Sequence, residues 1–244
     1  MKRKILSVLL VACMVIGLVP GPVMAENGDI QQISKKEYAI APGITEYELV
    51  TNNSELSAQQ VGHIMEVDLQ SGYADIIAGY NDYNIEAIAS GNNWGMRKPT
   101  EQAQNAETRR NVNVVGAVNG DFFNMSNGAP SGTLVMQGTP IKSGTTACFW
   151  IDSENKAHIS ANNADMNKEA DALGVTVQEA IGGNPVLIQN GEKTVSGNSY
   201  DDTANPRTSV GIKSDGTVVI YMVNGRQAPY SVGMSCGELA DIML

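Results

Sequence analysis

The chain has 244 residues, of which 42% are hydrophobic and 17% are charged, and it carries a formal net charge of −10. This composition fits one globular domain, or at most two small ones, and it excludes a disordered chain and a protein with many membrane spans. The acidic balance argues against a nucleic-acid partner, because sequence-independent binding to phosphates needs a cationic surface. An acidic chain that binds an anion must do so locally, with a few placed arginines.

The first 25 residues have the pattern of a secretory signal peptide. A basic start at residues 2–4 precedes an apolar run over residues 5–18, and Val23 and Ala25 supply small residues before Glu26. We therefore predict cleavage after Ala25 and a secreted or cell-surface protein with no membrane segment after cleavage. An uncleaved anchor is disfavoured because about 20 apolar residues are needed to span a bilayer. Lipoprotein processing at Cys13 is disfavoured because the following residues stay apolar.

The mature part begins with a polar N-terminal arm over residues 26–57, which leads into a domain over residues 58–244. Within the domain, two strand-like segments around a Gln-Ser-Gly turn predict a hairpin, and an Asn- and Gly-rich stretch predicts a surface loop. A helix is expected next, since Glu101 stands near its start and two arginines stand at its end, as the helix dipole favours. The hairpin, the loop and the helix cover residues 63–79, 80–99 and 100–110.

The second half predicts mainly strands. A nearly continuous apolar run over residues 112–118 is typical of a strand buried on both faces. A further hairpin joins 208–213 to 217–223, and Asn190-Gly191 indicates a type I′ turn. The other expected elements are strands at 132–136, 147–151, 156–160 and 185–188, a helix within 163–173 and a short helical turn at 177–181. The fold class predicted is α+β, with a curved mixed sheet built mostly from hairpins and a few packed helices.

The chain ends at the start of a helix. Ser235 and Glu238 have the spacing of a capping box, and apolar residues follow on one helix face up to Leu244. No helix stop signal follows, so the domain is expected to be incomplete at its C-terminus.

Cysteine and histidine give few chemical signals. Cys148 and Cys236 could form a disulfide or remain buried thiols, and the sequence favours neither. His63 and His158 are the only histidines, and neither lies in a metal or triad motif. We therefore expect no metal and no cofactor.

Three polar segments are candidates for a functional site. In the first, Asp121 follows the apolar run and precedes Phe122 and Phe123, which gives a carboxylate beside an apolar floor. In the second, Asn205-Pro206-Arg207-Thr208 offers a guanidinium fork that suits phosphate or carboxylate oxygens. For each there is an alternative interpretation: a tight turn with core phenylalanines for the first, and a surface salt bridge for the second.

The third segment combines Asn224-Gly225-Arg226-Gln227 with a stretch from Tyr230 to Gly233 that approaches the last helix. Free N–H groups and the dipole at a helix start favour an anion there. An ordinary loop before a capped helix would have the same pattern.

These segments, together with residues 182–187 and Asn190-Gly191, resemble the phosphodiester glycosidase family from about residue 60 to the end. The resemblance implies an exported hydrolase of glycosyl 1-phosphodiesters in surface or cell-wall glycans. Two departures are visible. Family members usually continue to an Asn-Leu-Asp-Gly-Gly-Gly-Ser segment that is absent here, so this fragment alone is expected to lack part of the site. Many relatives also have Asp where this chain has Asn224.

The resemblance also implies residue roles. Asp121 would act on the sugar, as catalyst or hydroxyl ligand, because cleavage at an anomeric carbon passes through an oxocarbenium-like state that a carboxylate stabilises or attacks. Arg207 would hold the departing phosphate. The substrate-binding set is completed by Asn119, Gly120, Phe122, Thr208, Arg226, Gln227 and Ser231.

The expected partner is a sugar 1-phosphodiester or glycan, and no oligomeric state is predicted. Two other hypotheses remain. One is a non-catalytic carbohydrate- or envelope-binding module on the same scaffold. The other is a metal-dependent phosphodiesterase that cuts on the other side of the phosphate, which the scarcity of histidine disfavours.

Overall fold

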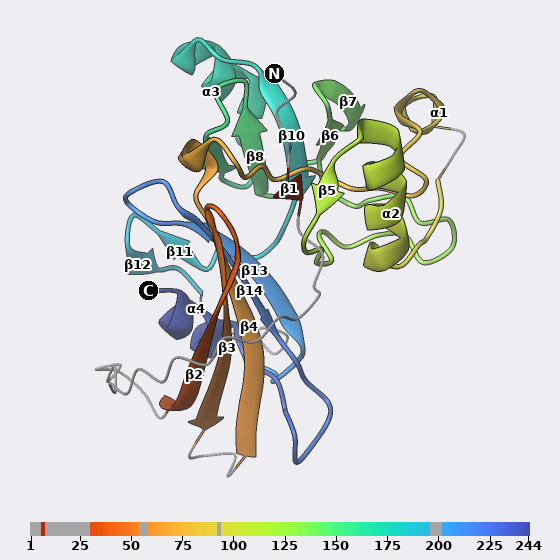
Figure 1. Ribbon diagram of the computed structural model, residues 1–244. Coiled ribbons are helices and arrows are strands. Elements are labelled where there is room, and N and C mark those ends of the chain that lie inside the picture. Colours follow the sequence, from red (N-terminus) through yellow and green to blue (C-terminus); the bar gives the residue numbers. More distant parts are fainter. Residues whose placement is uncertain (1–5, 8–29, 54–57, 92–93, 196–201) are drawn as a thin grey trace. The chain divides into compact units, whose positions relative to one another are not determined.

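The computed structural model describes residues 6–7, 30–53, 58–91, 94–195 and 202–244. The chain divides into two compact units (Figure 1). The first consists mainly of Val67–Asn184, and the second consists mainly of the segments before it, to Glu66, and after it, from Pro185. Sheets and helices coexist in an α+β fold, which confirms the predicted fold class. The predicted signal peptide and its cleavage site lie outside the described residues, apart from Leu6–Ser7.

The first unit contains a five-stranded antiparallel sheet in the order β7-β6-β10-β8-β9. Its strands are β6 (Leu134–Met136), β7 (Thr139–Lys142), β8 (Cys148–Asp152), β9 (Ala157–Ser160) and β10 (Val177–Gly182). Its helices are α1 (Ile85–Ala89), α2 (Pro99–Arg110) and α3 (Met166–Leu173), with a short 3-10 helix at Leu69–Ser71. A separate parallel pair joins β1 (Leu6–Ser7) to β5 (Asn113–Val114).

The core of the first unit has two clusters. Tyr80, Ile88 and Leu134 belong to one, which packs α1 and α2 against β6. Trp150 and Met166 belong to the other, which packs α3 against β8 and β10. The tight turn between β6 and β7 has positive φ at both Gln137 and Gly138, which is the geometry that a two-residue hairpin requires.

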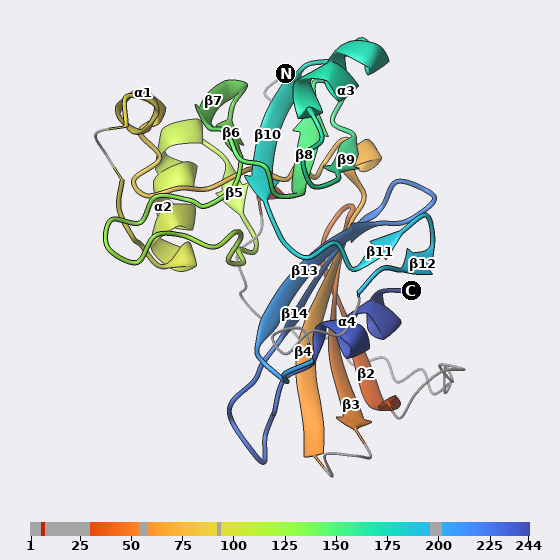
Figure 2. The same ribbon diagram turned by 180° about the vertical axis from the view of Figure 1, so that it is seen from behind.

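The second unit is built on a five-stranded sheet in the order β13-β14-β4-β3-β2. Its strands are β2 (Ile30–Ala41), β3 (Ile44–Asn53), β4 (Ala58–Val67), β13 (Arg207–Ile212) and β14 (Val218–Val223). A small hairpin pairs β11 (Ile188–Gln189) with β12 (Glu192–Lys193). The helix α4 (Cys236–Met243) packs on the sheet (Figure 2). Its Leu239 belongs to one core cluster with Tyr221 and Leu49.

Several sequence predictions are confirmed. The helices near 100–110 and 163–173 form, as does the hairpin of β13 and β14. Asn190 and Gly191 both have positive φ in the turn between β11 and β12, as the Asn-Gly signal predicts. The capping box at α4 is present, since Ser235 Oγ accepts from the Glu238 N–H and the Glu238 carboxylate accepts from the Ser235 N–H.

Other predictions from the first half are wrong. Residues 73–79 do not pair with β4; Asp68 caps a 3-10 turn that ends at Gly72 in the left-handed region, and the chain then leaves the strand direction. Residues 80–99 are not a surface loop, because they include α1 and contribute Tyr83 and Ile88 to the core. Residues 26–57, expected as an arm, form the hairpin of β2 and β3 over the described part.

Two predictions around the candidate site are also wrong. Only Asn113–Val114 of the apolar run 112–118 is a strand, and Val118 is 42% exposed. The β-branched composition indicated burial on both faces, but Val114 is the buried valine of this run that belongs to the core cluster, and Val112 packs against that cluster while only partly buried. Residues 177–181 form the central strand β10 instead of a helical turn, because this strand pairs on both sides, with β6 and β8.

A buried ion pair links α2 to the central strand. Glu179 on β10 is 6% exposed, and its carboxylate accepts from Arg110 Nη1 at 2.8 Å and from the Ala78 N–H at 3.2 Å. Burial raises the pKa of Glu179 to about 7, and Arg110 opposes this shift. Burial also raises the pKa of Tyr83, whose hydroxyl accepts from Arg110, to about 12.

Because the pKa of Glu179 is raised by folding, we predict that the free energy of unfolding falls as the pH rises from about 4.5 to about 7. In that window the folded state keeps a proton on Glu179 that the unfolded state has lost, so raising the pH favours unfolding. A shift of this size corresponds to at most about 3 kcal/mol. Glu179→Gln is neutral at every pH, so its melting temperature should depend less on pH than that of the wild type. Calorimetry of the wild type and Glu179→Gln over this pH range measures the difference, and Glu154→Gln, at an exposed position, is the control. The prediction is contradicted if the melting temperatures of Glu179→Gln and the wild type change equally with pH.

Candidate functional site

Asp121 lies in the first unit and is held by backbone donors. Its Oδ1 accepts from the Phe122 N–H at 2.7 Å, and its Oδ2 accepts from the Gly132 N–H. The chain turns back between these residues, since Phe123 bridges to Pro130 and the Ser131 N–H donates to the Phe122 carbonyl at 2.8 Å. The carboxylate is half-buried. This turn therefore fixes the direction of the carboxylate.

Three glycines let separate segments approach the Asp121 carboxylate, and we call Gly132, Gly144 and Gly182 the glycine junction. A Cβ on Gly182 would lie 2.8 Å from Asp121 Oδ2 and 2.9 Å from the Gly132 Cα. A Cβ on Gly144 would lie 2.6 Å from the same Cα. Real side chains do not reach such distances, so the contact of these segments depends on glycine at each position.

The residues around Asp121 are on the surface. Phe122 and Phe123 are 56% and 45% exposed, so the alternative that both are core residues is wrong. Asn119 and Gly120 are exposed as well. The structure thus has a fixed carboxylate with exposed apolar rings beside it, although the buried strand expected to support it does not form.

The second unit brings together the other two predicted segments at Asn205. Arg226 donates to Asn205 Oδ1 from Nε at 3.2 Å and from Nη2 at 2.7 Å. Arg207 donates from Nε to the Met234 carbonyl at 2.8 Å and from Nη2 to the Thr203 carbonyl at 2.9 Å. We call this group of Asn205, Arg207 and Arg226 the arginine cluster.

Close backbone packing holds the arginine cluster. Asn205 and Met234 exchange two backbone hydrogen bonds at 3.0 and 3.1 Å. A Cβ on Gly233 would lie 2.4 Å from the Asn205 carbonyl, and one on Gly225 would lie 2.4 Å from the Pro206 nitrogen. The motif glycines are therefore needed to bring the loop after β14 against the start of β13.

Ser231, Gln227 and Thr208 lie near this cluster in the chain, but they have structural contacts. The Ser231 hydroxyl is fully buried, accepts from the Val61 N–H at 3.0 Å and donates to the Asn224 carbonyl at 2.7 Å. Its backbone N–H donates to the Gln227 carbonyl at 3.1 Å. Thr208 lies on β13 opposite Met222. In this structure Ser231 joins a loop to β4, and the arginine side chains are the anion-binding candidates of this unit.

The predicted site residues thus form two groups, one in each unit: Asp121 with the glycine junction, and the arginine cluster. Sequence reasoning missed Gly132 and Gly144 of the first group. It also missed Thr146, whose Oγ1 lies, like Asp121 Oδ2, close to the position that a Cβ on Gly132 would take. The short Ser-Gly-Thr-Thr stretch at residues 143–146 is the signal that could have indicated a tight loop there. Cys148 and Cys236 are both buried thiols, and burial raises the pKa of the Cys148 thiol.

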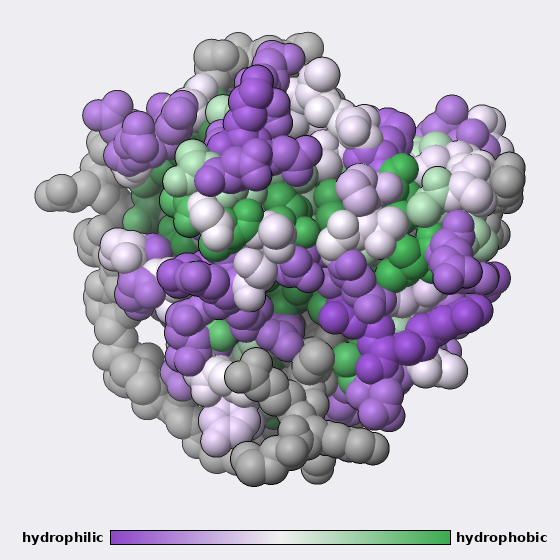
Figure 3. Space-filling model, turned by 90° about the horizontal axis from the view of Figure 1, so that it is seen from above, coloured by the Kyte–Doolittle hydropathy of each residue, from purple (hydrophilic) through white to green (hydrophobic). Residues whose placement is uncertain are grey.

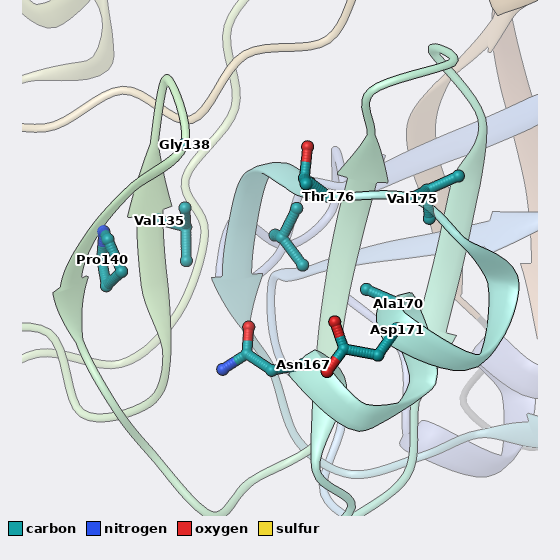
Figure 4. A pocket seen from close by; sticks show the side chains of 9 residues that line it. Val135, Gly138, Pro140, Asn167, Ala170, Asp171, Val175 and Thr176 are labelled. Carbon is teal, nitrogen blue, oxygen red and sulfur yellow. The ribbon is translucent and has the colours of Figure 1, made fainter.

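Two hollows in the first unit lie away from these motifs. One, of about 200 Å³, lies between α3 and the hairpin of β6 and β7, with Asn167 and Asp171 on the helix side and Val135 and Pro140 on the hairpin side (Figure 4). The other, of about 370 Å³, adjoins Arg110 and Glu179. Neither includes a predicted site residue. Polar residues cover much of the face shown in Figure 3, with hydrophobic residues exposed between them.

The residue ranges that the structure describes contain neither a cluster of metal ligands nor a helix that could span a membrane. No group of three or more His, Cys, Asp or Glu side chains there is placed to hold a metal ion. Each histidine instead contacts one carboxylate, His63 with Glu46 at 2.9 Å and His158 with Asp152 at 2.8 Å. None of the helices in these ranges has the length and apolar character that a membrane span requires.

Comparison with known proteins identifies the family. The model of the phosphodiester glycosidase family matches residues 112–244, which is more than half of the chain and includes Asp121 and the whole arginine cluster. The chain therefore belongs to the phosphodiester glycosidase family. It is also 44% identical over 43 residues to an uncharacterised protein of Rickettsia conorii, but this match spans only 18% of the chain and 15% of that protein.

Three solved structures share the fold. The catalytic domain of zebrafish N-acetylglucosamine-1-phosphodiester α-N-acetylglucosaminidase, auto-inhibited by its pro-peptide, matches with a TM-score of 0.62 and 17% identity, over 88% of this chain and 70% of that chain. A Synechocystis protein matches with a TM-score of 0.56 and 12% identity, over 86% and 56%. A Burkholderia pseudomallei protein described as exported matches with a TM-score of 0.52 and 11% identity, over 95% and 91%. At these identities the likeness shows the fold.

The glycine junction predicts a sharp contrast between two adjacent positions. Gly182→Ala should destabilise the protein by about 1–3 kcal/mol, because its Cβ would overlap Asp121 Oδ2 and the Gly132 backbone. Gly183→Ala should change stability by less than about 0.5 kcal/mol, since nothing lies within 4 Å of its Cβ position. Denaturant unfolding of both variants measures the difference. Equal stabilities would show that the junction tolerates a side chain.

Proposed function

We propose that this protein hydrolyses glycosyl 1-phosphodiesters, with Asp121 acting on the sugar and the arginine cluster holding the phosphate. Family membership supports a phosphodiester glycosidase activity in general. The observation that carries the specific proposal is that both chemical requirements occur as fixed groups within the matched region. One is a directed carboxylate, and the other is a pair of hydrogen-bonded guanidinium groups, that of Arg226 on Asn205 and that of Arg207 on two backbone carbonyls.

The carboxylate suits chemistry at an anomeric carbon. Departure of the phosphate leaves positive charge on the sugar ring, and a carboxylate either stabilises that charge or attacks the carbon. Asp121 is prepared for this because backbone N–H groups hold both of its oxygens in place. A fixed charge needs no reorganisation when the transition state forms. The exposed rings of Phe122 and Phe123 would cover an apolar face of the sugar.

The arginine cluster suits the departing phosphate. Arg226 donates two hydrogen bonds to the amide oxygen of Asn205, which is neutral, so the positive charge of Arg226 remains available to an anion. Arg207 is oriented through two backbone carbonyls. A guanidinium group can bind two phosphate oxygens at once. Holding the phosphate in place before the reaction lowers the entropic cost of reaching the transition state. The net charge of −10 does not oppose this, because a local site depends mainly on its nearest groups.

Export is part of the proposal. Residues 1–25 have the signal-peptide pattern, and one protein of the same fold is described as exported. The substrate would then be a sugar-phosphate linkage in surface or cell-wall glycans. Expression in a bacterial host, followed by mass spectrometry of the secreted chain, should give an N-terminus at Glu26.

Activity is tested with methyl esters of hexose and N-acetylhexosamine 1-phosphates. We expect the wild type to release free sugar, and Asp121→Asn and Arg207→Ala to lower kcat/KM by about 100-fold or more, as loss of a charge-stabilising group does. Arg226→Ala should have a smaller effect, mainly on KM. Arg109→Ala, at the end of α2, is the control. Full activity in folded Arg207→Ala would refute the assignment of the phosphate site.

The alternative is a carbohydrate- or envelope-binding module without turnover. It predicts that the protein stays bound to cell-wall glycan and releases no sugar from any of these esters. A metal-dependent phosphodiesterase would instead release the sugar 1-phosphate and would be inhibited by a chelator. Product analysis with and without chelator separates the three outcomes.

A further inference from the structure

One buried hydroxyl in the first unit has no partner. Thr146 lies in the loop between β7 and β8, and its Oγ1 is the one buried side-chain polar atom, among the described residues, that has no hydrogen bond. A buried donor left without a partner costs about 1–3 kcal/mol. Such groups are rare in folded proteins, and each one requires an explanation.

The position of this hydroxyl is built by its neighbours. The Thr145 carbonyl accepts from the Asn163 N–H at 2.7 Å, and the Ala147 N–H donates to Asn162 Oδ1 at 2.7 Å. The backbone is therefore fixed on both sides of Thr146. Two residues earlier, Gly144 packs against the Gly132 backbone, which presses the loop onto the glycine junction.

Side-chain oxygens of Thr146 and Asp121 lie close to the same side of Gly132. A Cβ on Gly132 would lie 2.5 Å from Thr146 Oγ1 and 2.7 Å from Asp121 Oδ2. Both oxygens therefore lie close to the position that a side chain on Gly132 would take, yet they form no hydrogen bond with each other. One is a hydroxyl that can donate, and the other belongs to a carboxylate that can only accept.

We infer that Thr146 is a ligand-binding residue of the Asp121 site and that the pair recognises one hydroxyl group of the sugar. A hydroxyl both donates and accepts, so it can donate to Asp121 Oδ2 while accepting from Thr146 Oγ1–H. Thr146 as a whole is only half-buried, so rotation about its Cα–Cβ bond can turn the hydroxyl toward a ligand. This inference rests on the proposed function, because it names the part of the substrate that Asp121 binds.

Asp121 and Thr146 together would also determine which sugars the site accepts. A site built to bond a hydroxyl rejects the analogue that lacks it, since both protein groups are then left without a ligand partner. We expect one deoxy position of the sugar to be rejected strongly by the wild type. The Thr146→Val variant should discriminate against that same deoxy sugar at least fivefold less.

Thr146→Val is the decisive variant, because valine has nearly the same shape and lacks the hydroxyl. A binding role predicts a KM raised at least fivefold while the melting temperature is unchanged or higher, since the unpartnered donor is gone. Thr146→Ser should keep most of the activity. Thr145→Val, at the exposed neighbouring position, is the matched control and should change neither quantity. Wild-type KM and kcat in folded Thr146→Val would overturn the inference while leaving the proposed function intact.

If the wild type hydrolyses none of these esters, a binding measurement tests the inference instead. Binding of hexose and N-acetylhexosamine 1-phosphates is then measured by calorimetry for the wild type and Thr146→Val. Binding weakened at least fivefold in the variant would support Thr146 as a ligand-binding residue although the hydrolase proposal had failed. Equal binding by both proteins, or no binding by the wild type, would overturn the inference.

Discussion

The candidate sugar site depends on the absence of side chains at three positions. Gly132, Gly144 and Gly182 come from three different segments, and a single added Cβ at any of them would overlap backbone or the Asp121 carboxylate. Glycine in such places loses more conformational freedom on folding than any other residue. Glycine is nevertheless required here, because the close backbone approach brings the Gly132 N–H to Asp121 and the loop that carries Gly144 and Thr146 to Gly132.

In the second unit, a buried side-chain amide holds separate segments together. Gln60, fully buried on β4, accepts from the Thr51 hydroxyl at 2.9 Å and donates to the Gly233 carbonyl and to Glu238, both at 3.0 Å. One amide thus connects β3, the loop that carries Gly233 and the first turn of α4. Because Gly233 packs on Asn205, the network extends to the arginine cluster. In both units, close backbone contacts between separate segments support the groups proposed to meet substrate.

The sequence was informative where a signal is local. Turns with Asn-Gly, the capping box at Ser235 and the helix ending at Arg110 depend on residues a few positions apart, and all of them form. It was misleading where neighbours far along the chain decide the structure. β10 was predicted as a helical turn because its central place between β6 and β8 is a tertiary property, and Val118 was predicted to be buried although it is 42% exposed. The motif residues were found from their residue chemistry and from the family resemblance, whereas Thr146 carries no motif, and only the structure shows its unpartnered hydroxyl.

The strand order of the first unit has a consequence for how the chain is made. β10 is the last strand of its sheet to be synthesised, yet it lies between β6 and β8. Until residue 182 has left the ribosome, β6 and β8 each expose a row of unpaired backbone groups. Both strands are fully buried in the finished sheet, and apart from Asp152 their residues are apolar. Nascent chains that stall before this point would be prone to pair with one another. In a protein of this topology, rapid completion of β10 would therefore shorten the time for which these strand edges are exposed during synthesis.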